Sequence, residues 1–188
     1  MFKYEKKLPY PINIKNKDVK LAKYIITQYG GYAGELGAAL RYFSQKFTMP
    51  TDEGRALLND IATEEIGHAE MICVMVHQLL ADASKEELME AGLTGTYVEH
   101  GFGIYPMDVN GMPFDAKTIA STGDAIVDLA EDMAAEEKAR IVYEHLIDIA
   151  DDEDVIDVLL YLRQREVVHY NMFKSLYKKY KEMRKFLD

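Results

Sequence analysis

The sequence predicts an all-α fold, a bundle of four long helices with a long crossover between the second helix and the third. Three observations lead to this prediction. Apolar residues recur at steps of three and four along four long stretches, which is the period of an amphipathic helix. No stretch alternates apolar and polar residues over more than a few positions, as a half-buried strand does. The 188 residues suffice for one sizeable core, so we expect a single domain over residues 1–188.

The four long helices are each bounded by a capping residue or a break. In chain order they are expected over residues 18–47, 51–81, 121–150 and 151–186. Asp18 can cap the first helix, and Thr51 or Asp52, after the break at Met49 and Pro50, can cap the second. Several glycines lie within the first helix, where each costs about 1 kcal/mol in propensity. We therefore expect a close approach of another backbone there, room beside the site, or a kink.

Two segments outside these helices are expected to be irregular. Residues 1–17 contain prolines and scattered lysines and are predicted to form an extended arm. Residues 82–120 are rich in glycine and contain two further prolines, so they are predicted to be a crossover loop after one short helix that begins near Ser84. Two helical hairpins joined by a long crossover are the layout of a ferritin-like bundle, in which the second and third helices run parallel.

Composition excludes some classes of function. The net charge of −10 disfavours nucleic acid, whose phosphates select basic surfaces, and it disfavours anionic membranes. No stretch approaches the roughly 18 apolar residues that a membrane helix needs, and the beginning of the chain lacks the apolar core of a signal peptide. The single cysteine, Cys73, lies in an apolar run and is expected to be a buried small side chain. We therefore expect a cytoplasmic protein.

Charged and imidazole side chains interrupt the apolar stripe of every long helix. They are Glu35 on the first, Glu65 and His68 on the second, Glu136 on the third, and Glu166 and His169 on the fourth. An ionised carboxylate that is buried alone costs several kcal/mol. Bound cations would neutralise such a set, and imidazoles would add neutral donors.

The spacing of these residues is repeated. Glu35 and Glu65 are 65 − 35 = 30 residues apart, and Glu136 and Glu166 are 166 − 136 = 30 residues apart. A histidine follows each second glutamate by three positions, which places both donors on one helix face. A Glu from two helices and Glu-x-x-His from two others is the ligand pattern of carboxylate-bridged metal pairs in helical bundles. The sequence thus predicts two metal ions bound by Glu35, Glu65, His68, Glu136 and His169, with Glu166 in or beside the site.

The same phase argument predicts which neighbouring residues face the site and which face outward. Tyr42 lies two turns after Glu35 on one face, so its hydroxyl can bond a metal-binding carboxylate, although an ordinary core position explains it equally well. His77 and His145 each lie half a turn away from the site and are expected to face outward. Glu64 and Glu137 are expected at the rim or in solvent. Iron and manganese both suit this donor set, whereas zinc favours fewer carboxylates and has no redox chemistry.

Several segments resemble the manganese catalase family, and its short branch of CotJC spore coat proteins most closely. They are YEKKLPYP (4–11), YGGYAGEL (29–36), TEEIGHAEM (63–71), AEEKAR (135–140) and REVVH (165–169). The resemblance implies that hydrogen peroxide is disproportionated to water and dioxygen at two manganese ions. It implies that Glu35 and His68 bind one ion and that Glu136 and His169 bind the other. Glu65 would bridge them, and Glu166 would carry protons.

The resemblance also bears on assembly. It implies a homo-oligomer, such as a hexamer, and a place in the spore coat among other coat proteins. One departure is Ala135, where many family enzymes carry an arginine thought to help gate the substrate channel. Two alternatives stay open, namely a di-iron peroxidase or oxidase of the rubrerythrin kind, and a structural coat protein with little turnover. A rubredoxin-like module, common in the rubrerythrin kind, is not expected with one cysteine.

Overall fold

The computed structural model of the chain describes residues 3, 5 and 7–185, apart from the side chain of Thr96. The expected end of the last helix at residue 186 lies outside this part. Its α-helices are α1 (Val19–Ile25), α2 (Thr27–Gly30), α3 (Glu35–Gln45), α4 (Asp52–Leu79), α5 (Lys85–Glu90), α6 (Thr94–His100), α7 (Ala125–Ile149) and α8 (Glu153–Lys185). Two short 3-10 helices, Lys46–Thr48 and Ala116–Thr118, lie in connections.

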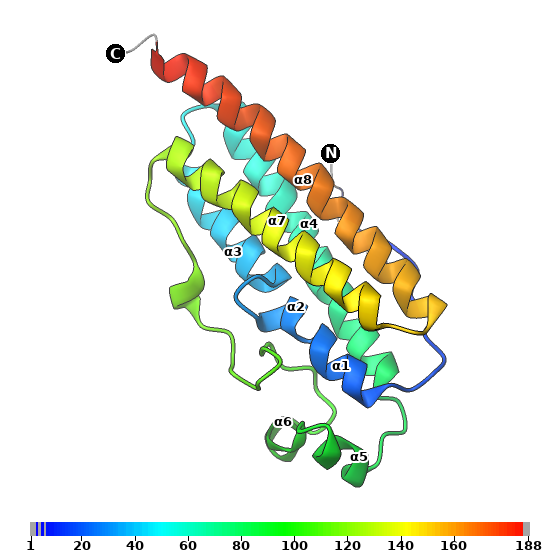
Figure 1. Cartoon of the computed structure of the whole chain (residues 1–188). Helices are drawn as coiled ribbons and strands as arrows, with labels where there is room; N and C mark the ends of the chain where they lie inside the picture. Colours follow the sequence, from blue (N-terminus) through cyan, green and yellow to red (C-terminus); the bar gives the residue numbers. More distant parts are fainter. Residues whose placement is uncertain (1–2, 4, 6, 186–188) are drawn as a thin grey trace.

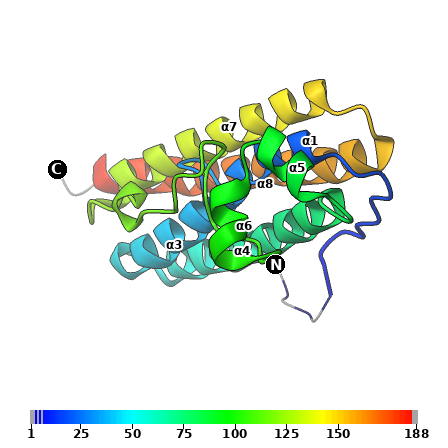
Figure 2. The ribbon, with the colours of Figure 1, turned by 90° about the horizontal axis from the view of Figure 1, so that it is seen from below.

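The arrangement is a ferritin-like helical bundle, as predicted. Helices α1 to α3 form one hairpin with α4, and α7 forms a second hairpin with α8 (Figure 1). Helices α4 and α7 run in the same direction, so the crossover returns along the side of the bundle before α7 begins (Figures 1 and 2). The described residues contain no strand, only an isolated bridge between Met107 and Pro113. None of the described helices is long and apolar enough to cross a membrane.

The apolar core is divided into two clusters along the bundle. On α4 one cluster includes Leu58 and Ile61, and the other begins at Met71. On α8 the first cluster includes Phe173 and the second ends at Leu162. The buried polar side chains of both helices lie in the interval between the clusters, so the site is enclosed by packed apolar layers on either side.

The prediction of one continuous first helix over residues 18–47 is wrong. Gly31 and Gly34 adopt extended backbone conformations, which end α2 and allow α3 to begin at Glu35. A Cβ at either glycine would lie less than 3 Å from the carbonyl oxygen of Thr27, at 2.5 and 2.8 Å. The sequence shows the glycines, but only the folded backbone shows that they break the helix. As a result Glu35 stands in the first turn of a helix, where the helix dipole favours a carboxylate.

The crossover is more ordered than the sequence predicts. Its first helix, α5, begins with the predicted Ser84 in a capping box with Glu87, and α6 follows as a second short helix that was not predicted. Its other end is tied to the bundle by buried polar groups. Asp128 of α7 accepts hydrogen bonds from Thr122 and Gly123, and Gln45 of α3 donates to the carbonyl of Ala120.

A glycine substitution tests the close packing of α2 under the crossover. In Gly30→Ala the new Cβ would lie 2.3 Å from the backbone of Pro106 and Met107, so we expect the free energy of unfolding to fall by about 1–3 kcal/mol. In the control, Gly37→Ala, the Cβ would lie 3.6 Å from Phe114 Cε2 and alanine favours the helix, so stability should hold or rise by up to about 1 kcal/mol. Urea unfolding measures both; equal effects would contradict this packing.

Candidate metal centre

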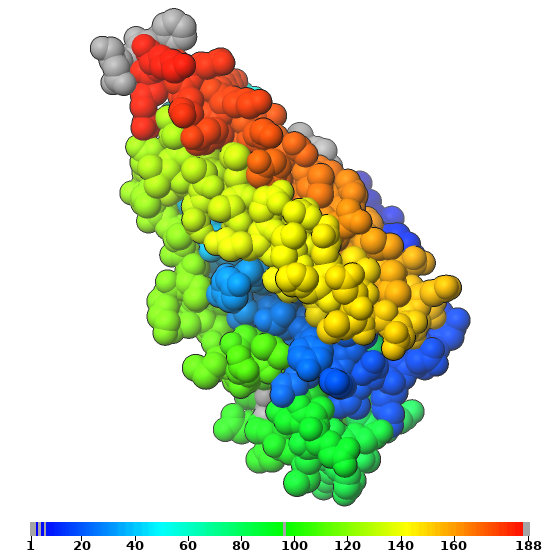
Figure 3. Space-filling model, viewed as in Figure 1, coloured from blue at the N-terminus to red at the C-terminus, as the bar shows by residue number. Residues whose placement is uncertain are grey.

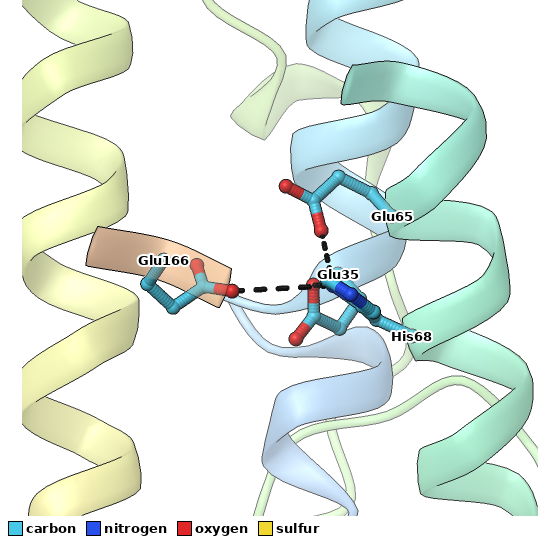
Figure 4. A group of neighbouring side chains, drawn as sticks. All are labelled: Glu35, Glu65, His68 and Glu166. Atoms are coloured by element: carbon cyan, nitrogen blue, oxygen red, sulfur yellow. Dashed lines mark hydrogen bonds and ion pairs between the residues drawn. The ribbon is translucent and has the colours of Figure 1, made fainter. Parts of the chain in front are cut away.

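Six polar side chains converge between the two apolar clusters. They are Glu35 from α3, Glu65 and His68 from α4, Glu136 from α7, and Glu166 and His169 from α8. Each is at most 2% exposed. Figure 4 shows four of them and the helices that carry them. The structure thus brings together every residue of the predicted metal set.

The donor atoms form two groups that share residues. In one group the donors come from Glu35, Glu65, His68 and Glu166, and in the other from Glu65, Glu136, Glu166 and His169. Within each group all the donor atoms lie within 4.8 Å of one another. Glu65 and Glu166 belong to both groups. Two overlapping groups of this kind are what a pair of adjacent ions requires.

Glu65 lies at the centre, between the two histidines. Its Oε2 is 2.7 Å from His68 Nδ1 and its Oε1 is 2.8 Å from His169 Nδ1. The outer carboxylates repeat the symmetry, because Glu35 Oε2 is 3.6 Å from His68 Nδ1 and Glu136 Oε2 is 3.6 Å from His169 Nδ1. Both Nδ1 atoms therefore face the carboxylates. Glu65 thus directs one oxygen toward each histidine.

Glu166 reaches the same space from farther away. Its Oε1 is 4.0 Å from His68 Nδ1, the longest of the three carboxylate contacts to that atom (Figure 4). This oxygen is buried and has no hydrogen-bond partner. Burial, followed by the charge of Glu35, holds the pKa of Glu166 well above its usual range. The side chain is therefore suited to keep a proton beside the site.

Two tyrosines hold the outer carboxylates. The hydroxyl of Tyr42 donates to Glu136 Oε1 at 2.5 Å, and the hydroxyl of Tyr143 donates to Glu35 Oε1. Each tyrosine thus bonds the glutamate of the other hairpin. Tyr143 was not singled out from the sequence, although the signal was present. It lies seven residues after Glu136, as Tyr42 lies seven residues after Glu35.

The expectation that Glu64 lies at the rim is wrong. Glu64 is only 7% exposed, because it points into the interface between α4 and α8. Its Oε1 accepts from Arg165 Nε at 2.5 Å and its Oε2 from Arg165 Nη2 at 3.2 Å. Burial opposes its charge, but the two site histidines and Arg165 outweigh burial and hold its pKa below the usual range. Glu137 has a 44% exposed side chain and pairs with Arg140, as expected at the rim, and His77 and His145 are exposed.

The protonation of the cluster follows from burial and from the charges that its members place on one another. Burial, with the charge of Glu65, raises the pKa of Glu35 to about 8. Burial also opposes the charge on Glu65, but the two histidines lower the pKa of that carboxyl below its usual range. Burial opposes the charge on His68 and His169 as well, yet Glu65 and the other carboxylates raise the pKa of both. In the metal-free protein, protons therefore compensate the buried acids.

The donor set fits a pair of first-row transition ions. Several of its atoms are buried without a hydrogen-bond partner, namely Glu65 Oε1, Glu136 Oε2, Glu166 Oε1 and His169 Nδ1. Buried polar atoms are rarely left in this state, since it costs free energy. Mixed carboxylate and imidazole donors suit iron and manganese. Bound ions would satisfy these atoms and replace the protons.

A small cavity lies beside the site, between α3 and α7. The small side chains of Ala38, Ala135 and Ala139 line it, together with Glu166 and the two outer carboxylates. Its volume is about 10 Å³, which is the space of about one water molecule. In Figure 3 the light-blue region at the start of α3 reaches the surface between yellow α7 and the green crossover.

Known proteins match nearly the whole chain. The family model described as "Manganese containing catalase" matches residues 1–187. Protein CotJC of Bacillus subtilis is 50% identical over 98% of this chain and 97% of its own. A probable manganese catalase of Clostridium acetobutylicum is 31% identical over 96% of this chain and 81% of its own. The crystal structure of KatB, a manganese catalase from Anabaena, superposes with a TM-score of 0.86 at 31% identity, over 96% of this chain and 81% of KatB.

The raised pKa of Glu35 makes the stability of the metal-free protein depend on pH. Between the ordinary value of 4.5 and about 8, the folded state binds more protons than the unfolded chain. The free energy of unfolding should therefore fall as the pH rises through this window, and the raised pKa values of Glu166 and the histidines act in the same direction. In Glu35→Gln the fall should be smaller, because glutamine stays neutral. Urea unfolding in chelator at several pH values measures it; a rise with pH would contradict it.

Proposed function

The chain belongs to the manganese-containing catalase family, and from this membership we propose that it binds two manganese ions and disproportionates hydrogen peroxide to water and dioxygen. The observation that carries the proposal is the pair of buried donor groups that share Glu65. Glu35 and His68 would hold one ion, Glu136 and His169 would hold the other, and Glu65 would bridge them. A bound manganese pair supplies the two-electron redox chemistry that both halves of the reaction need.

The protein side chains position the site and handle protons. Tyr42 and Tyr143 fix the orientation of the outer carboxylates through their hydroxyl groups. Glu166 lines the cavity, burial raises its pKa in the metal-free protein, and its Oε1 faces the site without a hydrogen-bond partner. Such a group can pass a proton to and from small oxygen species beside it. We therefore assign Glu166 as the proton carrier rather than as a metal ligand.

The access route suits a small substrate. Ala135 lies on the wall of the cavity, where a longer side chain would fill the space in front of Glu166. Arg41 is buried and also lines the cavity, where it adds a positive charge to a lining that otherwise holds three carboxylates. Hydrogen peroxide is little larger than water. A cavity of this size between α3 and α7 would suit a small substrate and exclude larger reductants from the buried site.

We extend the proposal to the setting of the protein. The 50% identity to CotJC over nearly the full length of both chains supports a place in the spore coat, with other coat proteins as partners. Membership of the family supports a homo-oligomer, such as a hexamer.

The alternative functions differ in the metal that the protein would bind and in whether it would release dioxygen. A di-iron oxidase or peroxidase would take up iron, and a structural coat protein would hold metal without turnover.

Metal analysis combined with an oxygen electrode separates these possibilities. Protein made with both manganese and iron available should hold about two manganese ions per chain and release dioxygen from peroxide. Iron without dioxygen release would support the di-iron alternative, and metal without turnover would support the structural one. Glu65→Ala and His169→Ala should lose both metal and turnover, whereas the control His145→Ala, at an exposed position, should keep both. A Glu65→Ala variant that still releases dioxygen from peroxide would contradict the site assignment.

The role of Glu166 is tested by removing its proton and keeping its shape. Glu166→Gln should retain about two manganese ions per chain but lose turnover on the order of 100- to 10,000-fold, because an amide cannot carry the proton. The matched control is Glu137→Gln, which lies on the exposed face of α7 and should keep full activity. Manganese content and initial rates of dioxygen release measure both effects. Loss of one ion in Glu166→Gln would show instead that Glu166 is a ligand.

A further inference from the structure

The two site histidines share a single acidic neighbour on the side away from the donor groups. Glu64 Oε2 is 3.2 Å from His169 Nε2, and Glu64 Oε1 is 3.5 Å from His68 Nε2. Among the described residues, no other carboxylate lies within 4.0 Å of either Nε2 atom. Both imidazole rings are fully buried, and they lie 5.7 Å apart and nearly parallel. One carboxylate thus faces the outer nitrogen of both rings.

The chemistry of imidazole determines which group donates and which accepts in this contact. A ring that binds a metal through Nδ1 must carry its proton on Nε2, and both Nδ1 atoms face the donor groups. Each buried Nε2–H then needs an acceptor, because an unmet donor in a dry site costs free energy. Neither Nε2 has a hydrogen bond of full geometry in the metal-free protein. Contacts at such sites are often long or poorly aligned before the site is loaded.

Arg165 keeps Glu64 in place. It donates two hydrogen bonds to the carboxylate from α8, whereas Glu64 belongs to α4, so the pair also joins the two hairpins. The repeat of the two hairpins shows how the positions of Glu64 and Arg165 are related. Glu136 follows Glu35 by 136 − 35 = 101 residues, and Arg165 follows Glu64 by 165 − 64 = 101 residues. The two residues hold equivalent positions in the two hairpins, so a strict repeat would set two like charges against each other.

We propose that Glu64, anchored by Arg165, is a positioning residue that both metal sites share. It fixes the Nε2–H form of His68 and His169 together and so presents both Nδ1 atoms to the ions. This inference rests on the metal pair of the proposed function and not on catalase turnover. Removing the carboxylate should therefore weaken both sites at once, which a pair that serves only to join two helices would not do.

Manganese binding to the metal-free protein tests the inference. In Glu64→Ala we expect the affinity of both sites to fall by about 10- to 100-fold, the usual effect of losing a partner of a metal-binding histidine. Competition with a chelator measures the affinity, and circular dichroism confirms that the variant is folded. The matched control is Glu53→Ala, because Glu53 also pairs across α4 and α8, with the exposed Lys179, and touches neither histidine. Unchanged binding in a folded Glu64→Ala variant would overturn the proposal.

Glu64→Gln sharpens the test. The two Nε2 atoms face different oxygens of Glu64, and the amide replaces one of these oxygens with a donor nitrogen. In the same orientation it can therefore accept from only one of the two Nε2–H groups. We expect one site to keep its affinity and the other to weaken about 10-fold or more. At one manganese per chain, electron paramagnetic resonance should then show the six-line signal of an isolated ion. Two sites of unchanged affinity would contradict the shared role.

Two further measurements keep the proposal testable. If Glu64→Ala does not fold, Arg165→Gln takes its place, since it keeps the carboxylate and removes its anchor. That variant should weaken both sites by a smaller factor, and full affinity in it and in Glu64→Gln would overturn the proposal. Wild-type protein that binds no metal pair would instead refute the proposed function. Wild-type protein that binds two ions without releasing dioxygen would refute only catalase turnover and leave the role of Glu64 standing.

Discussion

The structure depends on one electrostatic constraint, the burial of several carboxylates in a dry interval between two apolar clusters. Buried charges of one sign cost several kcal/mol unless something compensates them. In the metal-free protein the compensation comes from protons on Glu35 and Glu166 and from the histidines around Glu65. The same acids would exchange those protons for cations. The packed layers on either side make such compensation necessary, because they exclude the water that would otherwise solvate the charges.

The backbone departs from regular helical geometry at positions that determine where a buried carboxylate lies. The break between α2 and α3 moves Glu35 from the middle of a helix to a first turn, where the helix dipole supports a carboxylate. Glycines permit the break, and Gly30 also lets the crossover backbone approach α2. Polar groups of α3 and α7 then tie down the far end of the crossover. The interruption of the helix costs free energy locally. In return it places one donor, Glu35, and shapes the wall of the cavity.

Periodicity was sufficient to predict the bundle, the crossover and the convergence of the six polar side chains, because helix phase determines which residues face the interior. Tyr143 could have been found by the same offset that drew attention to Tyr42. Two features could not have been read from phase alone. The helix break at Gly31 and Gly34 depends on contacts with Thr27 that only the folded chain makes. The burial of Glu64 depends on Arg165, which is 101 residues away in the sequence and meets it across the helix interface.

The two hairpins are near copies, yet equivalent residues have different chemistry because their surroundings differ. Glu65 and Glu166 occupy matching positions, but two imidazoles flank Glu65 and favour its charge, whereas Glu166 faces other carboxylates and favours its proton. Sites that use an acid and a base often separate the pKa values of two like groups in this way. Glu64 and Arg165 are a second difference between the hairpins. They hold equivalent positions farther from the donor groups, yet one is negatively charged and the other is positively charged. In a repeated hairpin, two glutamates at equivalent positions thus acquire opposite protonation preferences, because the groups that surround them differ.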